Sequence, residues 1–95
     1  MPTRLGDEEI ERELAKLDGW SRSGDSINAQ FVFTDFGHAF GFMAEMAVLA
    51  EKLNHHPTWE NTYNRVSVTL TTHDVDGLSE HDFTMAARMS AAASR

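Results

Sequence analysis

The chain has 95 residues and a mass of 10.6 kDa, which fits one compact domain spanning residues 1–95 and approaches the size at which a single core is only marginally sufficient. Fifteen acidic residues against eight basic ones give a formal net charge of -7, the wrong sign for a surface that binds nucleic-acid phosphates directly. The absence of cysteine excludes disulfides, a thiolate nucleophile and cysteine-based zinc or iron-sulfur sites.

The sequence carries no signal for membrane insertion or secretion. Glu45 and Glu51 interrupt the longest apolar stretch, which stays well short of the roughly 20 residues that a membrane span needs. The segment from Met1 to Glu11 turns acidic at once and contains no apolar run before a small-residue cleavage site. We therefore expect a cytoplasmic protein that makes no membrane contact.

The first predicted elements are a helix and a hairpin. From Asp7 onward, apolar residues recur at helical spacing until Asp18-Gly19 closes the helix. These residues are Ile10, Leu14 and Leu17, and Leu5, just before Asp7, belongs to the same pattern. The apolar and polar residues of segment 27–34 alternate in strand period, and Trp20 to Arg22 is the expected partner strand.

Residues 36–53 form the longest predicted helix. We expect its core-facing sector to comprise Phe36, Ala39, Phe40, Met43, Met46, Ala47, Ala50 and Leu53. The polar stripe opposite is flanked by three more apolar residues, Phe42, Val48 and Leu49. This apolar surface exceeds what one small sheet can cover, which indicates contact with another subunit and predicts a homo-oligomer.

The second half of the chain predicts two strands and a last helix. Pro57 ends the middle helix and makes the adjacent histidines diverge, because it cannot continue the helical hydrogen bonds and restricts His56 to extended backbone. Segments 59–63 and 65–71 alternate as strands around a turn at Asn64, and Ser79 with Asp82 resembles a capping box. The expected fold is α+β, a two-layer sandwich with a four-stranded antiparallel sheet, helices on one face and the order α-β-β-α-β-β-α.

Three histidines, His55, His56 and His73, stand out as candidate functional residues. Histidine exchanges protons near neutral pH, so such a cluster can transfer protons on a small substrate without a metal. A metal site is the competing interpretation. We expect none, because two consecutive ligands that diverge at a helix break rarely close on one ion, and no His-x-x-x-His or Glu-x-x-His pair accompanies them.

The segment EKLNHHPTW at residues 51–59, together with Tyr63-Asn64, Thr72-His73, Gly77-Leu78-Ser79 and Asp82, resembles the pterin-4a-carbinolamine dehydratases. The resemblance extends upstream through Gly19-Trp20, Phe31, Phe33, Phe36, Ala39 and the run Phe40-Gly41-Phe42-Met43. It implies a cytoplasmic lyase that removes water from 4a-hydroxytetrahydrobiopterin, formed when aromatic amino acid hydroxylases use tetrahydrobiopterin, and releases quinonoid dihydropterin. It also implies dimers or tetramers that extend the sheet across subunits. The reaction needs neither redox nor covalent chemistry, so we expect no cofactor.

The resemblance places His55, His56 and His73 in the pterin site. We expect His55 and His73 to protonate the departing hydroxyl and His56 to bind the ring and act as base, although imidazoles that share a site titrate as a group and these roles are interchangeable. Glu51, one helical turn before His55, and Asp82, a helix-capping acid, are the expected supporting residues. Because polar site residues are not expected in the core, replacing them should change stability little.

The remaining aromatic residues and histidines receive weaker interpretations. Trp59 and Tyr63 have strand spacing and are expected in the core or an interface, with a wall of the pterin pocket as the alternative. His38 lies on the polar stripe of the middle helix, and His81 occupies a first-turn position where members of the resembled family often carry a basic residue. Neither is expected to take part in catalysis.

A non-catalytic role on the same fold is the alternative function. The resemblance includes proteins that act as dimerisation cofactors of a homeodomain transcription factor, and dehydratase-like domains that serve as assembly chaperones. The presence together of Glu51, Asp82 and the three histidines favours the enzyme, since a binding module has no need of this set.

Overall fold

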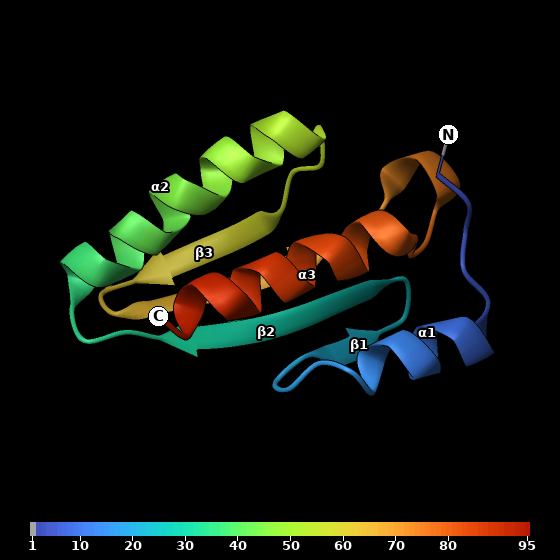
Figure 1. Ribbon diagram of the computed structural model, residues 1–95, viewed down its shortest axis with the longest axis horizontal. Helices are drawn as coiled ribbons and strands as arrows, with labels where there is room; N and C mark the ends of the chain where they lie inside the picture. Colours follow the sequence, from blue (N-terminus) through green and yellow to red (C-terminus); the bar gives the residue numbers. More distant parts are fainter. Residues whose placement is uncertain (1) are drawn as a thin grey trace.

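The computed structural model describes residues 2–95; Met1, the first residue of the predicted domain, lies outside the described part. Its elements are α1 (Asp7–Leu14), β1 (Ser21–Ser23), β2 (Ser26–Val32), α2 (Phe36–Leu53), β3 (Thr58–Thr62), β4 (Arg65–Leu70), the 3-10 helix η1 (His73–Val75) and α3 (Glu80–Ala93). The four strands form an antiparallel sheet in the order β1-β2-β4-β3, and the helices lie over one of its faces (Figure 1). This confirms the predicted α+β fold and its element order.

Strand β4 organises the sheet because it pairs with β2 on one side and with β3 on the other. Its alternation sends Val66, Val68 and Leu70 into the core, while Arg65, Ser67 and Thr69 face the opposite side. The opposite face is therefore polar along this strand, as the alternation predicted.

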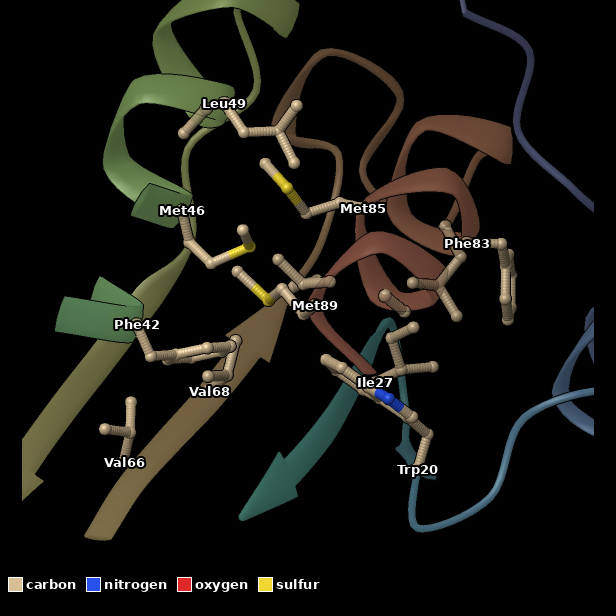
Figure 2. Packing of buried hydrophobic residues seen from close by; sticks show 14 of the residues in the cluster. Trp20, Ile27, Phe42, Met46, Leu49, Val66, Val68, Phe83, Met85 and Met89 are labelled. Carbon is tan, nitrogen blue, oxygen red and sulfur yellow. The ribbon is translucent and has the colours of Figure 1, made fainter. Parts of the chain in front are cut away.

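The core lies between the sheet and helices α2 and α3 (Figure 2). Phe42, Met46 and Leu49 of α2 meet Met85 and Met89 of α3 above the inward residues of β4. At the other end of the core, Trp20 is buried and its Nε1 donates a hydrogen bond of 2.8 Å to the Ser90 hydroxyl. These contacts hold α3 firmly across the sheet, and so fix the position of the residues in its first turn.

The predicted core sector of α2 is partly wrong. Ala39, Met46 and Ala50 are buried as expected, but the sector also includes Phe42 and Leu49, which had been assigned to its flanks. Four residues assigned to the core, Phe36, Phe40, Ala47 and Leu53, are exposed instead. The helix is apolar around most of its circumference, so the sequence pattern could not fix which side faces the sheet.

Smaller corrections concern the ends of elements. Helix α1 ends at Leu14 rather than at Asp18, although Leu17 still packs against the core. Tyr63 lies in the turn after β3, with a φ of 50°, and not in the strand. The short helix η1 was not predicted. None of the described helices is both long enough and apolar enough to cross a membrane.

Candidate functional site

The end of α2 directs two adjacent imidazoles to different partners. Helix α2 stops at Leu53, and Asn54 adopts the left-handed conformation with φ 52° and ψ 44°. Asparagine tolerates this conformation better than most residues, and it commonly closes helices in this way. The backbone N–H of His55 then donates to Ala50, after which His55 is buried and His56 is exposed. The predicted divergence of the two side chains is therefore present, with Asn54 as the residue that ends the helix and Pro57 beyond it.

His55 forms a buried pair with Asp82. Its Nε2 atom lies 2.6 Å from Oδ1 of Asp82, and the two side chains are 9% and 0% exposed. With Nε2 donating to the carboxylate, Nδ1 is the ring nitrogen left free for other chemistry. No buried side-chain nitrogen or oxygen of the described residues lacks a hydrogen-bond partner. Since Nδ1 makes no hydrogen bond within residues 2–95, this nitrogen must touch solvent.

Asp82 joins three segments of the chain. Its Oδ2 accepts from the Thr72 hydroxyl at 2.7 Å and from the backbone N–H of Ser79 at 3.0 Å, while the hydroxyls of Thr72 and Ser79 lie 2.7 Å apart. Ser79 and Asp82 form the predicted capping box at the start of α3. The same carboxylate thus caps a helix, binds the segment that follows β4 and holds Nε2 of His55. The expectation that site residues stand outside the core is wrong for His55 and Asp82, which are buried.

His56 forms a second histidine-carboxylate pair, with Glu51. The Nε2 to Oε1 distance is 2.7 Å, close to that of the buried pair, but the side chains of His56 and Glu51 are 56% and 80% exposed. Glu51 therefore contacts His56 and not His55, the partner expected from one helical turn. An exposed pair of this kind is weakened by solvent and salt, so it orients the imidazole less firmly than Asp82 does.

The structure connects His73 to this network only through the backbone. His73 opens η1, directly after Thr72, and is exposed. Within residues 2–95, no three His, Asp or Glu side chains converge in a way that could hold a metal ion. The arrangement around His55 and His56 thus offers imidazoles and carboxylates as proton donors and acceptors.

A small cavity of about 110 Å³ opens beside His55 between the end of α2 and the start of α3. Its lining residues are Leu53, His55, Glu80, His81 and Thr84. Trp59 and Tyr63 are not among them: Trp59 packs against the core, and Tyr63 lies exposed in the turn between β3 and β4.

His81, for which the sequence predicted no role in catalysis, lines this cavity. Its ring stands at 88° to the ring of His55, with 5.7 Å between the centroids. No pattern in the sequence indicated this contact, because His55 and His81 lie on different elements. Only the packing of α3 against the end of α2 brings them together.

Comparison with known proteins identifies the family. The family described as pterin 4 alpha carbinolamine dehydratase matches residues 3–92. The chain belongs to this family. A dehydratase relative from Rhizobium etli, named "Putative pterin-4-alpha-carbinolamine dehydratase", is 53% identical over 94 residues, covering 97% of this chain and 93% of its own. A protein of the same name from Brucella ovis is 50% identical over 92 residues, covering 95% of each chain. The name of these relatives is that of a hydro-lyase.

Solved structures of dehydratase-like proteins show the same fold. The crystal structure of a transcriptional coactivator/pterin dehydratase from Brucella melitensis has a TM-score of 0.94 at 49% identity, covering 96% of this chain and 99% of that one. A pterin dehydratase-like protein described as a RuBisCO assembly factor in the alpha-carboxysome has a TM-score of 0.66 at 24% identity. It covers 78% of this chain and 86% of its own, and this likeness concerns the fold alone.

Proposed function

We propose that this dehydratase converts 4a-hydroxytetrahydrobiopterin into quinonoid dihydropterin and water, using histidines as general acid and base. The reaction would recycle the pterin cofactor. Membership of the family and the names of relatives about half identical to this chain support the substrate class and the reaction. The observation that carries the mechanism is the buried bond between His55 Nε2 and Asp82 Oδ1. It holds Nε2 in a fixed place and leaves Nδ1 as the free ring nitrogen.

The reaction needs two proton transfers and no change of oxidation state. The hydroxyl on C4a gains a proton, the C4a–O bond breaks and water departs, while N5 loses its proton as the C4a=N5 bond forms. Each positioned acid or base contributes about 10²–10⁴-fold to such a rate, and holding the pterin in place supplies the rest. Imidazoles suit both steps because they gain and lose protons near neutral pH.

We assign the acid role to His55. In its protonated form, Nδ1 carries the proton that goes to the C4a hydroxyl, and Nε2 keeps its hydrogen bond to Asp82 throughout. Asp82 therefore keeps Nε2 in one place before and after transfer, as the carboxylate of a catalytic triad does for its histidine. His73, exposed at the start of η1, is the proposed second donor to the same hydroxyl.

His56 is the proposed base for the proton on N5. Its Nε2 is hydrogen-bonded to Glu51, which leaves Nδ1 to accept the proton from N5 of the pterin. The cavity beside His55 holds about 110 Å³, far below the 300–1,000 Å³ of typical ligand pockets. The cavity is therefore too small to enclose a pterin, and we propose that the ring lies across its mouth, with the exposed His56 reaching N5 from outside.

The test is to add purified protein to enzymatically generated carbinolamine and follow the quinonoid absorbance. The wild type should accelerate its appearance, and His55→Ala and His56→Ala should each lose most of this rate. His38→Ala is the matched control, because His38 is an exposed histidine that pairs with Asp35 at the start of α2. A wild-type rate equal to that of buffer would reject the reaction. Unaltered kinetics in both site variants would reject the assignment of residues.

We further propose that the dehydratase forms a homo-oligomer, a dimer or a tetramer. The supporting observation is an exposed apolar stripe on α2, in which Phe40 and Val48 are 59% and 72% exposed. The same stripe is the feature that favours the second candidate function, an interaction or assembly role like the coactivator named for the Brucella melitensis protein. A cytoplasmic location stays a prediction.

A further inference from the structure

The buried bond to Asp82 does not by itself fix the ring of His55. The Cβ–Cγ bond and the hydrogen bond at Nε2 hold two corners of the planar ring, and the ring can still tilt about the line that joins them. The position of Nδ1 depends on such a tilt, because it lies on the far side of the ring. A second contact is therefore required to hold Nδ1 toward the solvent-open side.

His81 supplies that contact. Its centroid lies 5.7 Å from that of His55, and the perpendicular arrangement is one that aromatic rings prefer at separations of 4.5–7 Å. The backbone of His81 is fixed as well, since its N–H donates to the Ser79 hydroxyl in the cap of α3 at 3.2 Å. Both residues line the same cavity, together with Leu53, Glu80 and Thr84. The ring of His81 thus stands on one side of the ring of His55, on a backbone held by the cap of α3.

We propose that His81 is a positioning residue of the dehydratase, which acts through His55 by keeping Nδ1 aimed at the substrate. This inference rests on the proposed function. It depends on the flat shape of the ring and not on its charge, so an uncharged aromatic ring of similar size should serve.

Two substitutions test whether His81 acts through the flat shape of its ring or through its polar nitrogens. His81→Ala removes the ring and should lower kcat by about 10- to 100-fold, since a small misplacement of a catalytic group has costs of this order, while KM stays within about twofold. His81→Phe should restore most of the lost kcat. His38→Ala serves as the control for loss of an imidazole elsewhere. An unchanged kcat in His81→Ala would overturn the proposal, as would a His81→Phe variant no better than His81→Ala, or a loss expressed in KM alone.

A measurement without substrate keeps this inference separate from the proposed reaction. In nitrogen-15 NMR spectra, Nδ1 of His55 should give a sharp signal in the wild type and in His81→Phe. In His81→Ala, the signal should broaden because the ring tilts about the retained Nε2 bond and Nδ1 moves between environments. An unaltered signal in His81→Ala would overturn the inference even in an active enzyme. An inactive wild type in which His81→Ala broadens the signal would instead reject the proposed reaction and leave the contact between His81 and His55 supported.

Discussion

The Nε2 atom of His55 lies 2.6 Å from Oδ1 of Asp82, although the two residues are 27 positions apart in the chain. The bond joins the segment after α2 to the first turn of α3, where Oδ2 of the same carboxylate accepts from the backbone of Ser79. One side chain thus contributes both to the stability of the fold and to the geometry of the candidate site. Because of this double role, substitutions in and around the site are expected to change stability and activity to different extents.

Replacement of Asp82 by asparagine should damage both stability and activity. The amide of Asp82→Asn offers one acceptor oxygen where the carboxylate offers two, and its NH₂ group faces a donor in a buried site. We expect the free energy of unfolding to fall by about 1–3 kcal/mol, and kcat to fall by about 100-fold or more. Urea unfolding and the quinonoid assay measure the two effects. Asp18→Asn, at an exposed position, is the control, and equal stability of the two variants would contradict the prediction.

Truncation of the two adjacent histidines should have unequal effects on stability. His55→Ala leaves Oδ1 of the fully buried Asp82 without its partner, whereas His56→Ala removes an exposed ring from an exposed pair. The free energy of unfolding should therefore drop by about 1–3 kcal/mol in the first variant and stay nearly constant in the second. Urea unfolding of both proteins is the measurement. Matching losses in the two variants would argue against the buried pair.

The kcat losses caused by replacing Glu51 and by replacing Asp82 should differ in their sensitivity to salt. Glu51→Gln should lower kcat by no more than about fivefold, since exposed ion pairs contribute little. In about 1 M salt, where charges are screened within roughly 3 Å, the gap between Glu51→Gln and wild type should close. The loss in Asp82→Asn should persist, because that site is buried. Rates of all three proteins at low and high salt test the contrast, and a Glu51→Gln defect that survives high salt would contradict it.

Asp35 should make the stability of α2 depend on pH. Its carboxylate caps the helix by accepting from the backbone N–H of His38, and this hydrogen bond lowers the pKa of Asp35 below its ordinary value. A carboxyl group with a lowered pKa stabilises the fold above its unfolded-state pKa of about 3.9, and this contribution is lost as the pH falls through the folded-state pKa.

The Tm difference between wild type and Asp35→Asn should therefore shrink between about pH 7 and pH 3. The amide that replaces the carboxylate in this variant does not titrate, but its oxygen still accepts from the backbone N–H of His38, so the cap itself is preserved. Thermal unfolding followed by circular dichroism at several pH values is the measurement. A Tm difference that stays constant over this range would show that the charge of Asp35 has no part in the cap.

The apolar stripe on α2 gives a prediction for self-association. Phe40 is exposed on this helix, so Phe40→Lys should place a charge in the proposed contact between subunits and reduce the mass of the oligomer. Light scattering after size-exclusion chromatography reports that mass. Ala91→Lys, at an exposed position of α3, is the control. If Phe40→Lys and wild type have the same mass, or if the wild type is a monomer, the stripe does not join copies of the chain.

The sequence predicted the strands and the last helix well because their signals are local. Alternation in segment 65–71 matched β4, and Ser79 with Asp82 marked the start of α3 correctly. The side of α2 that faces the sheet was harder to predict, since apolar residues occupy most of its circumference. Phe40 and Phe42 look equivalent in the sequence, and only tertiary packing buries one and exposes the other.

The candidate site shows the same division between local and tertiary information. The sequence singled out His55, His56, Glu51 and Asp82, but it could not pair them. Glu51 contacts His56 because Asn54 reverses the chain, and neither residue spacing nor helix geometry indicated that reversal. The contact of His81 with His55 depends on how α3 crosses the end of α2, so no local pattern contains it.

Sharing Asp82 between a helix cap and an imidazole has a further consequence. Fraying of the first turn of α3 releases the carboxylate, and with it the orientation of His55. Helix ends open more readily than a whole domain does. Mild heating or dilute denaturant should therefore abolish turnover while the methionine-rich core is still packed. The temperature or denaturant concentration at which activity is lost is then set by the first turn of α3, and it lies below that of global unfolding.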